Sequence, residues 1–204
     1  MPRARTTADP GDGLSTRQRR LRPVLAVHTG DGKGKTTAAM GTALRAWHQG
    51  WSIGVFQFIK SGRWHPGEQA ALEALGRLHD ATGEGGPVVW ETMGTGWSWT
   101  RAFSAGTDPA GAAREGWRQV CSLLADEALD FYLLDEFSYA LNWGWLDVDE
   151  VVDTLTHRPG SQHVVITGRN CPQQLIEAAD LVTEMTKISH PFDAGQRGQA
   201  GIEW

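Results

Sequence analysis

The chain has 204 residues, of which 40% are hydrophobic and 21% charged, and its formal net charge is −5. These values are typical of a soluble globular domain with a real core, and they give no reason to expect nucleic acid or a membrane surface as a partner. No apolar run approaches the roughly 20 residues that a membrane span needs. The two cysteines, Cys121 and Cys171, form neither a disulfide framework nor a four-ligand zinc site, so we expect a cytoplasmic protein.

Residues 1–23 contain six arginines but no apolar segment and no sustained periodicity. This pattern predicts a flexible N-terminal segment rather than a secretory signal, and a short helix that docks elsewhere is the alternative. We expect residues 24–204 to form a single domain.

From residue 24 onward, apolar strand-like runs alternate with helical patterns. The runs that predict strands are 24–29, 52–59, 87–90, 130–134, 163–167 and 181–183. The helical patterns cover 35–49, 67–79, 110–128, 148–156 and 173–179, and we expect an irregular tail from residue 189. Strands that alternate with helices of this length predict an α/β fold with a mostly parallel sheet, covered by helices on both faces.

The strongest motif lies between the first predicted strand and the first predicted helix. The residues expected to bind the phosphates of a nucleotide there are Gly30, Asp31, Gly32, Lys33, Gly34, Lys35, Thr36 and Thr37. Glycines let backbone N–H groups converge on phosphate oxygens, while Lys35 supplies a positive charge and Thr36 a hydroxyl for Mg²⁺. The strict P-loop pattern has glycine where Thr29 stands, so the motif is a near-match. Its strand–loop–helix setting favours phosphate binding over a simple tight turn.

An acidic pair, Asp135 and Glu136, follows the apolar run 131–134. A carboxylate at the tip of a buried strand can hold Mg²⁺ directly or through water, although Asp135 could instead only cap the next element. Together with the loop, the pair predicts an Mg-nucleoside triphosphate site with Thr36, Asp135 and Glu136 as metal ligands. The predicted fold is therefore a single-domain P-loop NTPase of the RecA-like type, which does not specify the reaction.

Several common chemistries have no support in the sequence. The seven histidines show no metal-ligand spacing, no serine–histidine–acid order is evident, and no residue is recognisable as one that positions an attacking water. A RecA-like ATPase coupled to a partner or to DNA remains the alternative function. The negative net charge weighs against DNA as its partner.

Six ordered motifs resemble those of ATP:corrinoid adenosyltransferases of the CobA/CobO type, which act on cob(I)yrinic acid a,c-diamide or cob(I)alamin. They cover residues 30–45, 57–60, 93–99, 134–139, 165–169 and 190–195. Asp31 stands where asparagine is frequent, Trp97 stands where phenylalanine is frequent, and the glycine-rich stretch 82–87 looks like an insertion. The resemblance implies transfer of the 5′-deoxyadenosyl group of ATP to the Co(I) ion of a corrinoid, with release of triphosphate.

The resemblance also implies roles for individual residues. Co(I) is already a strong nucleophile, so the protein needs no general base and must instead stabilise charge on the departing triphosphate. The catalytic candidates for this task are Lys35, Thr36 and Glu136. Arg45 and Arg169 would bind the nucleotide, and an ordinary surface ion pair is the alternative for both.

Trp97 and Trp99 would form the platform below the corrin ring. Two aromatic residues at i and i+2 are also the pattern of one face of a core strand, but the glycines around them favour a loop. The resemblance further implies Mg²⁺ or Mn²⁺, a flavin or flavoprotein electron donor and a homodimer, in which residues 1–23 cover a corrinoid site. The tail 198–204 resembles that of the CobO type, which implies cobyrinic acid a,c-diamide as the corrinoid.

Overall fold

The computed structural model describes residues 13, 15–59, 66–94 and 108–202. Within these residues, six strands form one sheet in the order β3-β2-β4-β5-β1-β6, and every neighbouring pair is parallel. The strands are β1 (Leu25–Thr29), β2 (Ile53–Gln57), β3 (Val88–Thr92), β4 (Phe131–Asp135), β5 (His163–Thr167) and β6 (Leu181–Glu184). The α/β fold with a parallel sheet is therefore confirmed.

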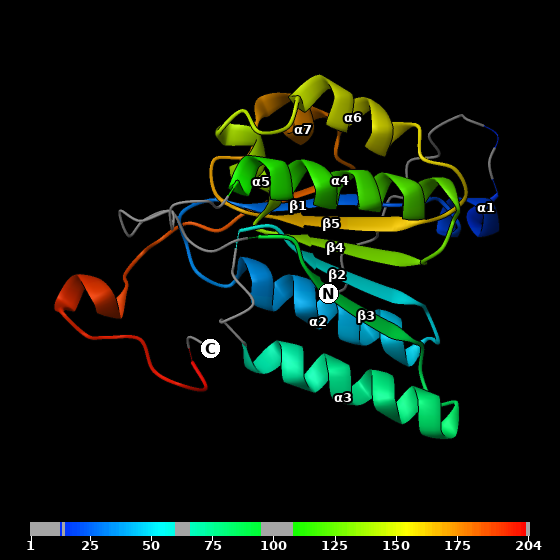
Figure 1. The fold of residues 1–204 in the computed structure, drawn as a ribbon, viewed down its shortest axis with the longest axis horizontal. Helices are drawn as coiled ribbons and strands as arrows, with labels where there is room; N and C mark the ends of the chain where they lie inside the picture. The colour runs from blue at the N-terminus through cyan, green and yellow to red at the C-terminus, as the bar shows by residue number, and fades with distance from the viewer. Residues whose placement is uncertain (1–12, 14, 60–65, 95–107, 203–204) are drawn as a thin grey trace, which may run out of the picture.

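Helices cover both faces of the sheet, as Figure 1 shows. Helices α4 to α7 lie over one face, and α2 and α3 lie over the other. Their bounds are α1 (Thr16–Arg20), α2 (Lys35–His48), α3 (Gly67–Thr82), α4 (Pro109–Ala125), α5 (Phe137–Asn142), α6 (Val148–Thr156) and α7 (Gln173–Ala178). None of the helices in the described part of the chain has the length and apolar character that crossing a bilayer requires.

Three local features differ from the sequence prediction. Helix α5 was not expected, because six residues are too few to show a helical period. Helix α1 is the short helix that the sequence offered as an alternative within residues 1–23. The tail is irregular except for one turn of 3₁₀ helix, Pro191–Ala194.

The glycine-rich stretch 82–87 lets two segments approach closely. Helix α3 ends at Gly83, whose φ is 76°. A Cβ on Gly85 would lie 2.2 Å from the ring of Trp47, and one on Gly86 would lie 1.9 Å from the carbonyl oxygen of Trp51. These glycines therefore bring the start of β3 against the end of α2.

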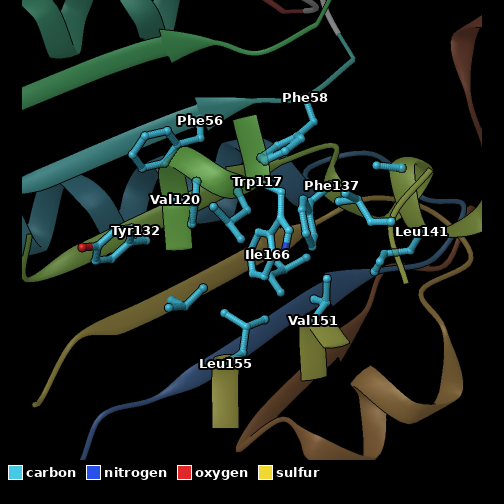
Figure 2. Packing of buried hydrophobic residues seen from close by; sticks show 14 of the residues in the cluster. Phe56, Phe58, Trp117, Val120, Tyr132, Phe137, Leu141, Val151, Leu155 and Ile166 are labelled. Carbon is cyan, nitrogen blue, oxygen red and sulfur yellow. The ribbon is translucent and has the colours of Figure 1, made fainter. Parts of the chain in front are cut away.

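The alternation of side chains along each strand supplies two cores. Leu134 and Ile166 face α4, α5 and α6, where they pack with Trp117, Phe137 and other buried residues (Figure 2). On the opposite face, the intervening strand residues pack against α2 and α3 in a second cluster. Because both faces are buried, the functional groups are restricted to the ends of the strands.

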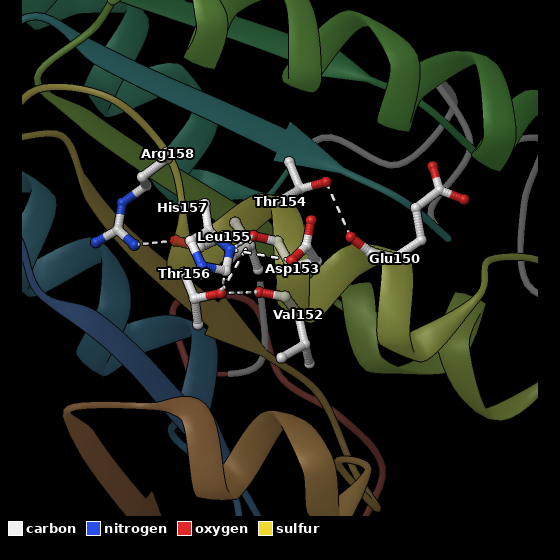
Figure 3. Close-up of polar contacts among 8 residues, drawn as sticks. All are labelled: Glu150, Val152, Asp153, Thr154, Leu155, Thr156, His157 and Arg158. Atoms are coloured by element: carbon white, nitrogen blue, oxygen red, sulfur yellow. Dashed lines mark hydrogen bonds and ion pairs between the residues drawn. The ribbon is translucent and has the colours of Figure 1, made fainter.

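Helix α6 is fixed at both ends by side chains. The Asp147 carboxylate accepts a hydrogen bond from the Glu150 N–H at 2.9 Å, which caps the first turn. At the other end, Thr156 donates to the Val152 carbonyl at 2.7 Å and Arg158 donates to the Leu155 carbonyl (Figure 3). The contact from Arg158 satisfies the Leu155 carbonyl, which the helix itself leaves unpaired.

Candidate functional site

The loop between β1 and α2 is shaped by a close approach of the chain that follows β6. The Gly32 N–H donates to the Met185 carbonyl at 2.6 Å, and the Met185 N–H donates to the Thr29 carbonyl at 2.9 Å. A Cβ on Gly30 would lie 2.5 Å from the Met185 carbonyl oxygen, and one on Gly32 would lie 2.6 Å from it. Glycine is therefore required at both positions by backbone proximity, in addition to any role with a ligand.

Lys35 bends back over this loop. Its Nζ donates to the Gly30 carbonyl at 2.7 Å and to the Gly32 carbonyl at 2.6 Å, so its charge is held at the mouth of the loop. Burial, followed by the positive charge of Arg169, lowers the pKa of Lys35, and the carboxylates of Glu136 and Asp31 partly oppose this. The side chains of Asp31, Lys33 and Thr37 are exposed around the same loop.

Asp135 is the centre of a buried polar cluster. It is fully buried, and three side chains donate to its carboxylate: Thr36 at 2.7 Å, Thr167 at 2.8 Å and Gln57 at 3.2 Å. These donors come from α2, β5 and β2, because the carboxyl ends of parallel strands meet at one edge of a sheet. Thr36 and Asp135, which the sequence paired as metal ligands, are therefore in direct contact.

Glu136 lies beside this cluster with a left-handed backbone, φ 56°. Its N–H donates to the Thr167 hydroxyl at 3.0 Å, and that hydroxyl in turn donates to Asp135. A residue other than glycine rarely adopts this conformation, and such residues tend to cluster at functional sites. Thr167 thus positions both acidic residues.

Arg169 follows β5 and belongs to the same site. Its carbonyl accepts hydrogen bonds from the Ser138 hydroxyl at 2.7 Å and from the Asn142 amide at 3.0 Å, which fix it to α5. At Gly168, φ is 146° and a Cβ would lie 2.0 Å from the Ser138 hydroxyl oxygen. The positive charge of Arg169 acts on Lys35, so the structure places Arg169 near the loop.

Arg45 is not brought to the loop. It lies in the last turn of α2, ten residues after Lys35, or about 15 Å along the helix at 1.5 Å per residue. Helix α2 runs back along the sheet (Figure 1). Arg45 therefore lines a cavity together with Val24 and His163, which lie at the amino ends of β1 and β5. The residues predicted to bind the corrinoid, Trp97 and Trp99, lie outside the described residues.

Sequence reasoning missed Gln57, Thr167, Met185 and an aromatic group at the end of α5. There, Trp143 packs against Tyr139 with ring centroids 5.4 Å apart and against Trp145 at 4.7 Å. Gln57 lies within the predicted strand 52–59, and Thr167 ends the predicted strand 163–167. Both also belong to motifs that carry the family resemblance, but neither was given a role. Nothing local marked Met185, because its role depends on β6 pairing with β1.

The fold is an α/β protein with a parallel sheet. Its candidate site combines a glycine-rich loop that opens a helix with buried acidic and hydroxyl groups at the carboxyl edge of the sheet, an arrangement typical of phosphate-binding sites. Residues 21–204 match the family model described as ATP:corrinoid adenosyltransferase BtuR/CobO/CobP. The chain belongs to this family.

Curated relatives agree with this assignment. The corrinoid adenosyltransferase of Escherichia coli (strain K12) is 43% identical over 183 residues, which are 90% of this chain and 86% of that protein. Corrinoid adenosyltransferase CobA of Salmonella typhimurium is 41% identical over 184 residues, with the same coverage of 90% and 86%. The corrinoid adenosyltransferase of Pseudomonas aeruginosa is 40% identical over 184 residues, 90% of this chain and 84% of that protein.

The predicted family and activity are thereby confirmed. The chain is an enzyme that transfers the adenosyl group of ATP to a corrinoid. The alternative, a RecA-like ATPase coupled to a partner or to DNA, is not supported.

Proposed function

We propose that residues 30–37 form a P-loop that binds the triphosphate of ATP, in a domain of the RecA-like type. The observation that carries this proposal is the position of the Lys35 ammonium, 2.7 and 2.6 Å from two loop carbonyls, beside the Thr36–Asp135 contact. The strand order supports it, because β5 lies between the loop strand β1 and the acidic strand β4.

We propose Mg²⁺ or Mn²⁺ as the metal, held by Thr36, Asp135 and Glu136. The donor atoms are all oxygens, as these hard cations prefer, and Mg²⁺ needs few protein ligands because phosphates and water complete its shell. No group of three or more His, Cys, Asp or Glu residues that could hold a metal occurs in the described ranges, so the triphosphate would have to contribute ligands. When bound, the ion neutralises charge on the triphosphate.

The proposed reaction needs no general base. The lone pair of Co(I) attacks the 5′ carbon of ATP, a Co–C bond forms, the C5′–O bond breaks, and its electron pair leaves with triphosphate. Lys35, Thr36 and the loop N–H groups stabilise the charge that develops on this leaving group. Arg169 adds a second positive charge. The nucleotide would bind in the reverse of the usual direction, with the loop around the far end of the triphosphate and the 5′ carbon exposed.

We propose that Trp97 and Trp99 contact the lower face of the corrin ring, and that cobyrinic acid a,c-diamide is the corrinoid. We leave Arg45 out of the nucleotide site, because its distance along α2 separates it from the loop of the same chain. A flavin or flavoprotein would supply the electron that produces Co(I).

We also propose a cytoplasmic homodimer in which residues 1–23 cover the corrinoid site of the neighbouring subunit. Helix α1 precedes β1 and therefore lies at the amino end of the sheet, opposite the loop (Figure 1). This position suits a contact with the partner better than a contact with the chain's own loop.

An anaerobic assay with ATP, Mg²⁺ and chemically reduced Co(I) cobyrinic acid a,c-diamide tests the proposed function. We expect the absorption spectrum of the adenosylated corrinoid together with one equivalent of triphosphate. Release of ADP and phosphate, or an unchanged spectrum, would contradict the proposed reaction.

A further inference from the structure

A second concave site lies beneath α2, away from the phosphate loop. A cavity of about 330 Å³ opens between this helix and strands β1, β4, β5 and β6. It is open at the sheet edge, where all the residues of β6 are exposed. The site described above makes no use of it.

The walls of the cavity are mainly apolar and include a flat aromatic surface. Trp51 stacks on His163 with ring centroids 4.7 Å apart and planes inclined by 15°. Ala26, Phe131 and Val165 add apolar surface from the sheet. Small-molecule sites have about 300–1,000 Å³ and apolar walls with a few convergent polar groups, so this cavity suits a small planar ligand.

One of these polar groups is an acceptor on a largely buried side chain. His28 is 8% exposed, and its Nδ1 lies 3.3 Å from the Lys35 carbonyl oxygen. Because a carbonyl can only accept, Nδ1 carries the hydrogen, and in the neutral ring Nε2 is then an acceptor. Nε2 has no hydrogen-bond partner in the part of the chain that the structure describes, and the side chain lines the cavity. A ligand N–H would satisfy it.

The other two groups are donors. The Val24 N–H donates to Nδ1 of His163 at 3.2 Å, so the ring hydrogen of His163 is on Nε2. Burial and, second, the charge of Arg158 lower the pKa of His163 against the opposing effect of Asp130, which favours the neutral ring. Arg45 lies on the wall, and its guanidinium has no ion pair within the described residues.

We propose that this cavity binds a small planar aromatic anion that carries an N–H donor. Its carboxylate would pair with Arg45, its N–H would donate to Nε2 of His28, and its ring would lie beside Trp51 and His163. The proposal is independent of the function proposed for the phosphate loop.

Three matched probes test each proposed contact on the full chain. The protein is saturated with Mg-ATP, so that the anionic probe cannot bind at the phosphate loop. Indole-3-acetate carries both groups, 1-naphthaleneacetate lacks the N–H, and indole-3-acetamide lacks the charge. Measured by saturation-transfer NMR, indole-3-acetate is expected to bind at least about fivefold more tightly than either analogue. Equal affinities for the three, or no binding, would overturn the proposal.

Variants locate the site. Ala46→Leu fills the cavity and should abolish binding, whereas Leu44→Ala, on the same turn but outside the walls, should leave it unchanged. Arg45→Met should remove the preference for the acid over the amide. Should Ala46→Leu not fold, Leu181→Glu at the exposed mouth places a negative charge there and should weaken binding.

Binding that survives both Ala46→Leu and Leu181→Glu would place the probe elsewhere and overturn the assignment. Sedimentation at several protein concentrations tests the other occupant, a second copy of the chain. If dimer formation displaces indole-3-acetate, the cavity is a subunit interface and the proposal is wrong.

Discussion

Thr167→Val should remove the hydroxyl that positions Asp135 and Glu136 in the candidate site. Thr167 is 1% exposed, donates to Asp135 at 2.8 Å and accepts from the Glu136 N–H at 3.0 Å. Valine has nearly the same shape but neither donates nor accepts, so one charged hydrogen bond is lost and one N–H is left unsatisfied. Together these effects should cost about 2–4 kcal/mol of folding stability.

The same substitution should also lower the affinity of the site for Mg²⁺. Loss of a group that orients a metal ligand typically lowers metal affinity by about 10- to 100-fold, so the Mg²⁺ concentration for half-maximal turnover should rise by that factor. Thr167→Ser keeps the hydroxyl and should lose only about 1 kcal/mol of stability, with its Mg²⁺ dependence unchanged. Urea unfolding and Mg²⁺ titrations of the two variants provide the comparison. If the Mg²⁺ dependence of Thr167→Val matched that of Thr167→Ser, the positioning role of the hydroxyl would be refuted.

Three further predictions concern the loop, the N-terminal segment and the tryptophans. Lys35→Ala should lose about 2–4 kcal/mol of transition-state stabilisation, and near-normal turnover in the Co(I) assay would contradict the P-loop assignment. Deletion of residues 1–20 should raise the Michaelis constant for the corrinoid more than that for ATP, and unchanged constants would remove any role in covering the site. Trp97→Ala and Trp99→Ala should lose far more activity from Co(II) with a reductase than from Co(I), because the rings would displace the axial ligand that hinders reduction. Equal losses in both assays would mean that the rings only bind or pack.

The alternation of apolar runs and helical patterns was enough to predict the parallel α/β fold. Residues that are buried on both sides of a sheet read as short continuous apolar runs, and Phe131–Asp135 is an example. The loop before α2 was also recognisable locally, because glycines, a lysine and a threonine at fixed spacing lie between a strand and a helix. The strands, the helices and the loop each depend on residues that are neighbours in the sequence, so a short stretch of sequence is enough to predict them.

The partners of each site residue were decided by the tertiary structure. Asp135 meets Thr167 and Gln57 because β4 pairs with both β5 and β2, and the loop meets Met185 because β6 pairs with β1. Such pairings join segments that are far apart in the chain, and no local pattern specifies strand order. Arg45 is the opposite case, because it is near Lys35 in sequence but far from the loop in space. The two residues are ten positions apart on α2, and a helix rises about 1.5 Å per residue.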